Sequence, residues 1–517
     1  MKKYLVVALA ALFVLGFAAS SFAIHAEIPA ETQAAVAAGG TQITIGGDIR
    51  IRGRIVNNVS DFNSGGKSVG DNSFWDERVR LQVEAKVTPN TTGLIQLESG
   101  DSNHDTYTWG KGAGSNTGMG ATGIITAGDY KPSTVNILQA WILHQGTGLL
   151  GVPALVKIGH MPIQIDSLFY SHTKYGDDAL LLGVDPIKGM HIIAGTVKLG
   201  ESSTTFTQAN LINGTNLTNT NTSRDVNGYT LIASYAFDKD SAVGFDITYA
   251  DGQNMQALYY PIFATPGYTN NGPTLPGDLH LWNFAVNGKT RIAGLGIKAE
   301  LDFQSGSATD LPTSMLGDLK FRGMAAKLDL DYKINPVTLM FSAAYGSGDD
   351  FNKLTTGVGG SYPTGDHKIR NFITTLENIQ HYTLVYEYFT QNAAGNISGG
   401  LQNTWFLNLG AKADLMKNLD GMINIYYLQA VETTAACVNA QRAGVPNPFC
   451  SKDIGTEVDV NLNYQIDKNL KYYVEGGYLF AGNFWKNLTP SAVNAGGISG
   501  KSPDDAWVLR HGIQLSF

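Results

Sequence analysis

The last residues of the chain, AWVLRHGIQLSF from Ala506 to Phe517, alternate in side-chain character along their whole length. Side chains of a strand point alternately to its two faces. One face then carries Trp507, Leu509, His511, Ile513, Leu515 and Phe517, and the other carries Val508, Arg510, Gly512, Gln514 and Ser516. The pattern predicts a strand with one apolar and one polar face, which fits an edge of a soluble sandwich or the wall of a transmembrane barrel.

The same alternation continues near the start of the chain. Between Thr41 and Asn57, and again between Arg78 and Thr88, an apolar residue and a polar or charged residue take turns. The polar face of the first segment holds Arg50, Arg52 and Arg54, and that of the second holds Arg78 and Arg80. A face charged at every second residue must be hydrated, and a water-filled lumen hydrates it.

The connections between such segments alternate in length. Short ones, such as Thr88–Thr91 and Leu415–Lys417, follow long ones rich in Gly, Asn and Thr, such as 102–133. Short periplasmic turns and long external loops are typical of an all-β, up-and-down antiparallel transmembrane β-barrel of about 18–20 strands. Antiparallel order favours 20 over the alternative of 18, because Ser202–Leu211 and Ile369–Asn378 are then needed as strands. The long connection after His160, predicted over 162–186, is a candidate for an inward constriction.

The N-terminus indicates export. Lys2 and Lys3 precede an apolar run, and small residues stand at Ser21 and Ala23, so 1–23 is predicted to be a signal peptide. A short periplasmic segment, 24–40, and a barrel, 41–517, follow. The chain is expected in the cell outer membrane, in contact with lipid, lipopolysaccharide and the barrel-assembly machinery. A formal net charge of -8 argues against nucleic acid as a partner.

Several stretches resemble the alginate-export family of outer-membrane barrels. They are Ile454–Tyr464, Asn469–Gly482 and the final DDAWVLRHGIQLSF, together with Val156–Pro162 and Val184–His191. The start, Ile28–Thr32 and Thr41–Arg50, resembles porins of metal-reducing delta-type bacteria. The resemblance implies a transmembrane barrel and makes Phe517 a candidate assembly signal. The alginate exporter has a strongly cationic pore, whereas the polar faces here mix both signs, which puts alginate as a solute in doubt.

Two charged walls are predicted inside the barrel. Closure places the last strand beside the first, so a basic wall forms from Arg50, Arg52, Arg54, Arg78, Arg80 and Arg510. An acidic wall forms from Glu457, Asp459 and Glu475, with a second part at Glu300, Asp302, Asp329 and Asp331. Such a transverse field favours anions near the arginines. The alternative is that the charges pair across strands and only keep the pore wet.

The sequence predicts one disulfide and no catalytic site. Cys437 and Cys450 share one predicted external loop, and a disulfide there would stabilise the folded chain by roughly 3 kcal/mol. No haem-attachment motif, metal-ligand spacing or catalytic triad frame is found, so no cofactor, no metal and no enzymatic activity are predicted. The preferred function is a porin for passive or weakly selective diffusion of small hydrophilic, including anionic, solutes. The alternatives are a sheath around a separate periplasmic or surface multihaem cytochrome, and a polysaccharide exporter.

Overall fold

The computed structural model describes most of the chain from residue 40 onward. The described residues are 40–59, 62, 72–99, 107–109, 135–147, 151–165, 168–200, 206–208, 217–219, 225–254, 276–309, 318–354, 365–374, 382–388, 390, 401–433, 435–444, 450–488 and 502–517. The predicted signal peptide, 1–23, and the periplasmic segment up to residue 39 lie outside them.

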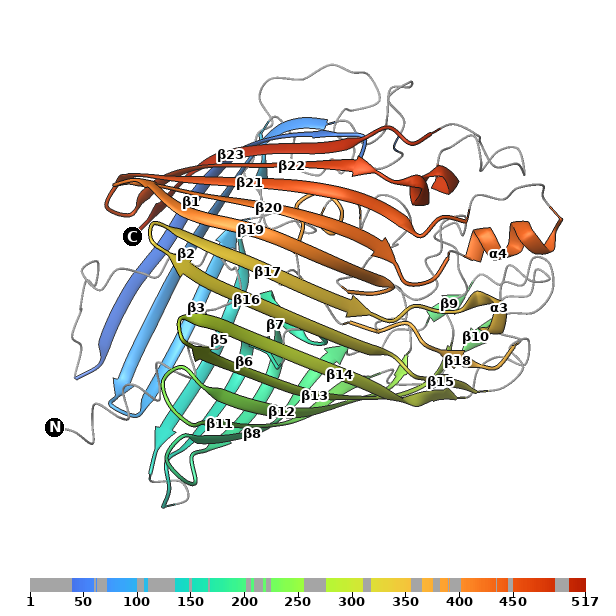
Figure 1. The fold of residues 1–517 in the computed structure, drawn as a ribbon. Coiled ribbons are helices and arrows are strands. Elements are labelled where there is room, and N and C mark those ends of the chain that lie inside the picture. Colours follow the sequence, from blue (N-terminus) through green and yellow to red (C-terminus); the bar gives the residue numbers. More distant parts are fainter. Residues whose placement is uncertain are drawn as a thin grey trace.

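A closed antiparallel barrel of 18 strands makes up the fold (Figure 1). In chain order its strands are β1 (Gln42–Asn57), β2 (Asn72–Thr88), β3 (Thr91–Ser99), β5 (Val135–Gly146), β6 (Ala154–Gln164), β7 (Ser171–Val184), β8 (Met190–Gly200), β11 (Val226–Ala236), β12 (Ala242–Asn254), β13 (Pro276–Ile292), β14 (Leu295–Thr309), β16 (Met324–Ile334), β17 (Val337–Gly346), β19 (Thr404–Met416), β20 (Leu419–Ala430), β21 (Asp453–Asp467), β22 (Leu470–Ala481) and β23 (Ala506–Ser516). Each strand pairs with its neighbours in this order, and β23 pairs with β1.

The seam between β1 and β23 closes the barrel. Asp48 lies opposite Ser516, and Asn57 lies opposite Trp507. At its end the backbone of Phe517 exchanges two hydrogen bonds with Gly47, at 2.8 and 3.0 Å. The predicted closure by the last strand is therefore present, and it leaves no free sheet edge in this wall.

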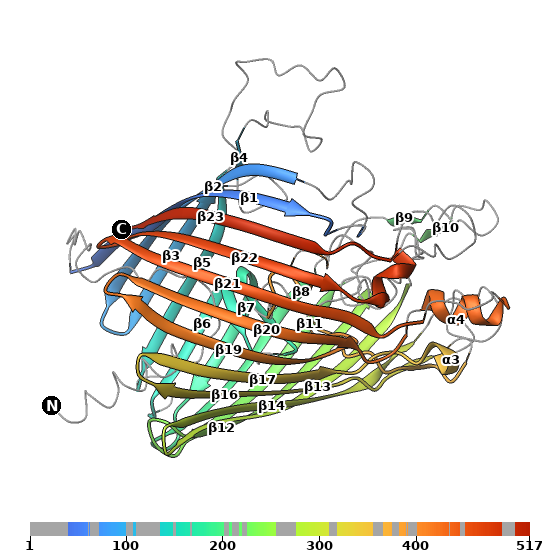
Figure 2. The same ribbon diagram turned by 45° about the horizontal axis from the view of Figure 1, so that its top comes forward.

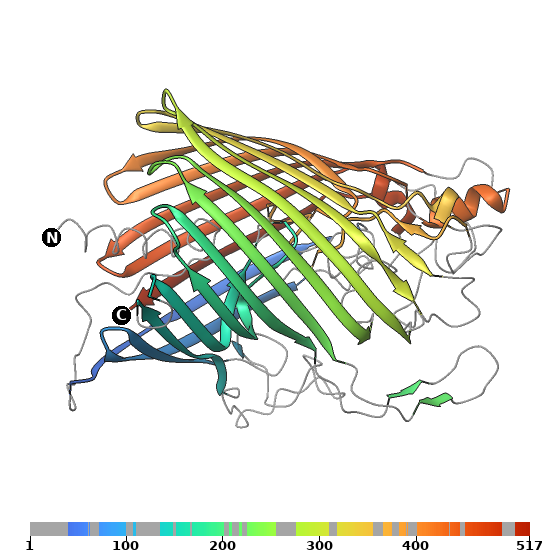
Figure 3. The same cartoon turned by 90° about the horizontal axis from the view of Figure 1, so that it is seen from below.

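The lower of the two predicted strand counts is confirmed, and the preferred count of 20 was wrong. Only three residues of Ser202–Leu211 form a described strand, β9 (Phe206–Gln208), which pairs with β10 (Leu217–Asn219) in a separate sheet away from the wall (Figure 3). The described part of Ile369–Asn378 contributes one residue to β18 (Lys368–Ile369), which is not a wall strand. In turn β7 lies within the predicted long connection 162–186. The prediction failed because polar residues such as Asp177 and Asp178 occur inside β7.

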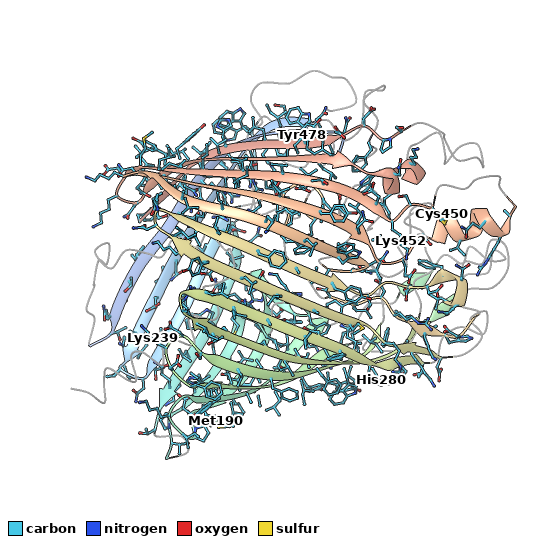
Figure 4. All side chains as sticks on the ribbon, viewed as in Figure 1. Met190, Lys239, His280, Cys450, Lys452 and Tyr478 are labelled. Carbon is cyan, nitrogen blue, oxygen red and sulfur yellow. A yellow bond between two sulfur atoms is a disulfide. The ribbon has the colours of Figure 1, made fainter. Side chains whose placement is uncertain are left out.

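The two ends of the barrel differ. The C-terminus and the short turns lie at one end, and α3 (Phe351–Leu354) and α4 (Ala435–Arg442) lie at the other (Figure 2). The long connections also contain β4 (Tyr107–Thr108), β15 (Leu319–Phe321) and the 3-10 helix η1 (Asn483–Leu488). Figure 4 labels Lys239 and Met190 at the short-turn end, and Cys450 and Lys452 at the long-loop end. In the described ranges, no helix has both the length and the apolar composition needed to cross a membrane.

The outer face of the barrel is apolar. Large apolar side chains that alternate along the strands are exposed, including Ile49 at 37%, Leu407 at 44% and Leu409 at 65%. The residues between them point inward, and Arg52 and Asp76 are buried. An exposed apolar belt with a polar interior is the reverse of a soluble protein and is what lipid contact requires.

Inside the long-loop end, apolar side chains form one packed cluster. Loop residues such as Phe62, Leu168, Phe372 and Trp485 contribute to it and are at most 1% exposed. Phe62 stacks on Trp485 with a centroid separation of 4.0 Å. The lumen is therefore lined by charged strands over part of its length and filled by loop side chains near the long-loop end.

Candidate functional site

The basic wall lies on three adjacent strands at the seam. Arg50, Arg52 and Arg54 come from β1, Arg78 and Arg80 from β2, and Arg510 from β23. Arg50 is in register with Arg78, and Arg54 is in register with Arg510. Strand alternation puts all six side chains on the lumen side, while Ile49 and Ile55 face outward.

Each described ion pair of this wall joins neighbouring strands. Asp76 is shared by two arginines, because Arg52 Nη2 lies 3.1 Å from Oδ1 and Arg54 Nε lies 2.8 Å from Oδ2. Arg78 Nη2 donates to Asp48 Oδ1 at 2.7 Å. Arg80 pairs with Glu98 on β3, and Arg510 pairs with Glu475 on β22. One carboxylate thus serves two guanidinium groups at the centre of the wall.

The acidic wall is placed on two parts of the barrel. Glu457 and Asp459 lie on β21 and Glu475 on β22, next to the seam, while Glu300 and Asp302 lie on β14 and Asp329 and Asp331 on β16. Three strands, β17, β19 and β20, separate the two parts. The sequence predicted two parts, and the structure keeps them apart.

Most of the acidic wall binds protein groups. Glu457 accepts the backbone N–H groups of Val385 and Tyr386 at 2.5 and 2.9 Å, and Asp459 accepts that of Leu384 at 3.1 Å. These donors belong to residues 382–388, here called the inner segment, which lies in the long connection between β17 and β19. A backbone N–H inside a barrel needs an acceptor, and a carboxylate is a strong one.

The second part of the acidic wall also holds a loop. Glu300 accepts the backbone N–H of Leu168, from the connection between β6 and β7, at 2.9 Å. Asp302 accepts a hydrogen bond from Asn283 at 2.8 Å. Nearer the short-turn end, Asp329 accepts a bond from Ser342 at 2.7 Å, and Asp331 pairs with Arg291 at 2.8 Å.

The inner segment reaches across from the acidic wall to the basic wall. Tyr382 stacks on Phe406 of β19 at 4.5 Å, and the Tyr386 hydroxyl lies 2.7 Å from that of Thr404. At its other end the ring of Tyr388 lies 5.0 Å from the Arg510 guanidinium carbon. The segment therefore narrows the lumen beside the basic wall.

A second inward contact joins the two connections. The side chain of Gln304 on β14 donates to Ile373 O at 2.6 Å and accepts Ile373 N–H at 2.8 Å. Thr374 Oγ1 then donates to the carbonyl of Phe169 at 3.4 Å. In the connection after His160, the candidate for an inward constriction, residues 168–170 are buried and Leu168 binds Glu300, but β7 follows them directly.

The connection that contains the inner segment is fixed at its start by a buried carboxyl group. Asp349 accepts the backbone N–H groups of Arg370 and Asn371 at 2.6 and 3.0 Å. Burial raises the pKa of Asp349 to about 6. Asp349 follows the end of β17, outside the wall strands.

Cys437 and Cys450 are joined by a disulfide with a Cα–Cα distance of 5.2 Å. Cys437 belongs to α4, and Arg442 of the same helix donates to the carbonyl of Phe351 in α3 at 3.3 Å. The disulfide thus lies beside the start of the connection that holds the inner segment. In the part of the chain that the structure describes, no group of three or more His, Cys, Asp or Glu residues is arranged to hold a metal.

The sequence did not reveal the inner segment as a lumen element. Its available signal is composition, because Leu384, Val385 and Tyr386 are apolar residues within a connection, and such residues need a buried place. The same holds for Leu168 and Phe169. Which wall they contact depends on long-range folding.

Comparison with known proteins finds one matching family model. Residues 265–498 match the family model described as alginate export. The resemblance predicted from the sequence is confirmed over this alginate-export region. The region contains the whole acidic wall and the inner segment, whereas every residue of the basic wall lies outside it. No curated protein matches the sequence.

Solved structures with a similar fold include three porins of Pseudomonas aeruginosa. OpdK with vanillate has 12% identity and a TM-score of 0.48, covering 92% of this chain and 98% of that chain. OccK11 (OpdR) has 10% identity and a TM-score of 0.47, covering 92% and 96%, and OccK9 (OpdG) has 13% and 0.47, covering 92% and 98%.

Proposed function

We propose that this chain is an outer-membrane channel through which small hydrophilic solutes diffuse passively, with a preference for anions. The observation that carries the proposal is the basic wall, in which one carboxylate, Asp76, faces both Arg52 and Arg54. Guanidinium groups that share a counter-ion keep donors and positive charge available to a passing anion.

The inner segment supports weak selectivity. Tyr388 lies against Arg510, so a solute that passes the basic wall also passes an aromatic ring. A narrow region next to fixed positive charge raises the local concentration of anions more than a wide pore does. The acidic wall opposes this effect little at Glu457, because that carboxylate is fully buried under the inner segment.

Export of an anionic polysaccharide is the second candidate. The match of residues 265–498 to the alginate-export family favours it, and a ladder of arginines also suits a chain of repeated carboxylates. A polymer must thread the lumen in extended form. Polymer would then block the current of small ions, whereas a monomeric solute would pass.

The cytochrome-sheath hypothesis receives less support. A sheath must leave room for a second folded protein inside the barrel. The inner segment and the 168–170 connection instead lie inside the barrel near the long-loop end, where they contact the two parts of the acidic wall.

The decisive experiment is single-channel recording of the purified protein in planar bilayers under a salt gradient. We expect steady openings with a reversal potential on the anion side. The test variant is Arg52→Gln/Arg54→Gln/Asp76→Asn, which removes the shared carboxylate together with its partners and so leaves no buried charge unpaired.

The variant should keep its barrel, checked by heat-modifiable mobility, and shift preference towards cations. The matched control is Lys239→Gln, in an exposed turn at the short-turn end. An unchanged reversal potential in a folded triple variant would reject the proposed role of the basic wall, and a silent wild-type barrel would reject the diffusion channel. Block of the current by an oligomeric uronate, but not by its monomer, would favour the exporter.

A further inference from the structure

The outer face of the barrel is not equally tall on all sides. On β19 the outward, mainly apolar positions run from Leu415 to Trp405, ten residue steps. On β6 they run from Ala154 only to His160, six steps, and on β7 from Val184 only to Asp178, also six. At roughly 3.3 Å per residue and a tilt of about 40°, these are about 25 Å against about 15 Å of membrane height.

Lipid does not match the low side well. The apolar band of such barrels is about 25 Å tall, so the outward surface of β6, β7 and β8, here called the short face, is about 10 Å too short. Mismatch of this kind costs fractions of a kcal/mol per Å and is relieved by thinning the bilayer or by association. Strands β6 and β8 have 11 residues each, against 17 in β13 and 15 in β14, while β7 has 14.

Charged side chains form a row above the short face. His160 lies opposite Asp178, and Asp178 lies opposite Lys198 in the next strand pair. His160 Nδ1 is 3.1 Å from Asp178 Oδ1, and Lys198 Nζ is 2.8 Å from Asp225 Oδ2. Asp178 and Asp225 thus alternate with His160 and Lys198 along the row. The Asp178 side chain is 74% exposed, so its carboxylate is open to a further donor.

We propose that the short face is the surface through which this chain associates with a second copy of itself. A row of alternating sign is self-complementary, because rotation about an axis normal to the membrane brings Asp178 of one copy towards cationic residues of the other. Below the row, the exposed apolar residues Ile158 and Leu182 of the short face, with Ile142 of the adjacent β5, would pack between the copies. Association removes the mismatched face from lipid, which supplies part of the driving force.

The first test uses cysteine cross-linking in isolated outer membranes. Leu182→Cys stands on the short face, with 49% exposure of the native side chain, and Leu409→Cys is the matched control on the tall side at 65%. Oxidation should join two chains at position 182 and not at 409. Equal cross-linking at both positions, none at 182, or a product of a mass other than two chains would overturn the proposal.

The second test addresses the charged row. Asp178→Arg puts like charges beside His160 and Lys198, and the full-length protein in detergent should change from oligomer to monomer by light scattering. Asp467→Arg, at the short-turn end of β21 and away from this face, is the control. Heat-modifiable mobility shows that each variant is folded. A folded Asp178→Arg protein of unchanged mass, or a monomeric wild type, would contradict the inference.

Discussion

The two charged walls arise from the same sequence pattern but have different partners. In both, charged residues occupy alternate positions of neighbouring strands. The arginines pair with carboxylates of adjacent strands, such as Arg78 with Asp48, whereas Glu457 and Asp459 accept backbone N–H groups of the inner segment. The reason is chemical, because a loop that enters a lumen brings N–H donors, and only an acceptor can satisfy them. The acidic wall therefore positions a loop, whereas the basic wall joins neighbouring strands through ion pairs.

Substitution at the seam between β1 and β23, which carries part of the basic wall, should have the largest effect, a loss of barrel assembly. Phe517→Asp places a charge at the end of β23, beside Gly47, on the face that carries Leu515 and Ile513. We expect most of the protein to fail to assemble, measured as loss of the heat-modifiable band in outer membranes. Phe517→Tyr, which keeps the aromatic ring, should assemble normally. Normal assembly of the Asp variant would show that the C-terminal residue is not an assembly signal.

Loss of the carboxylates that hold the inner segment, Glu457 and Asp459, should have the next largest effect, an increase in conductance. Glu457→Ala/Asp459→Ala leaves three backbone N–H groups without these acceptors, at roughly 1–3 kcal/mol each. The segment should leave its position, and single-channel conductance should rise several-fold. Glu457→Gln/Asp459→Asn retains oxygen acceptors and should change conductance much less. Equal conductance in both variants would show that the carboxylates of Glu457 and Asp459 do not hold the inner segment in place.

A smaller effect, on the reversal potential, is expected when a carboxylate that pairs with the basic wall is removed. Glu475→Gln removes the carboxylate that pairs with Arg510 while keeping a side chain of the same size. Asn461 donates to Glu475 Oε1 at 3.0 Å, a bond that a Gln oxygen can keep. The reversal potential should move further to the anion side by a few millivolts, at unchanged conductance. A shift towards cations would contradict the assigned sign of the wall.

The smallest predicted effect is a pH dependence at Asp349. Its pKa in the folded chain, about 6, lies above the ordinary value of an Asp, so its protonated form is favoured by folding. The stability it contributes is complete below about pH 4 and is lost as pH rises through about 6, on the order of 2–3 kcal/mol. Hydrogen exchange of the Arg370 and Asn371 amides, corrected for intrinsic rates, should therefore be faster at pH 7 than the corrected rate at pH 4.

The control for this effect is Asp349→Asn. Its side-chain oxygen can accept the same two N–H groups, at 2.6 and 3.0 Å in the native chain, but it does not titrate. Corrected exchange in this variant should not change between the two pH values. A wild-type protein with equally constant exchange would show that burial of Asp349 does not govern this connection.

The sequence by itself determined the wall of the barrel and most of its inward charges. Period-two alternation is a local property, so the faces of β1, β2 and β23, and with them Arg50, Arg52, Arg54, Arg78, Arg80 and Arg510, follow from the order of residues. The adjacency of Arg54 and Arg510 follows once the barrel is closed. The strand count was less secure, because the adjacent charged residues Asp177 and Asp178 in β7 resemble a loop.

Only the tertiary structure decided which partner each inward charge has. Glu457 and Arg52 both point inward from wall strands, yet Glu457 accepts the backbone N–H groups of residues 385 and 386, and Arg52 pairs with Asp76. The donors that reach Glu457 are about 70 residues away in the chain. No local pattern specifies so distant a contact, because it depends on how a long connection packs inside the closed barrel.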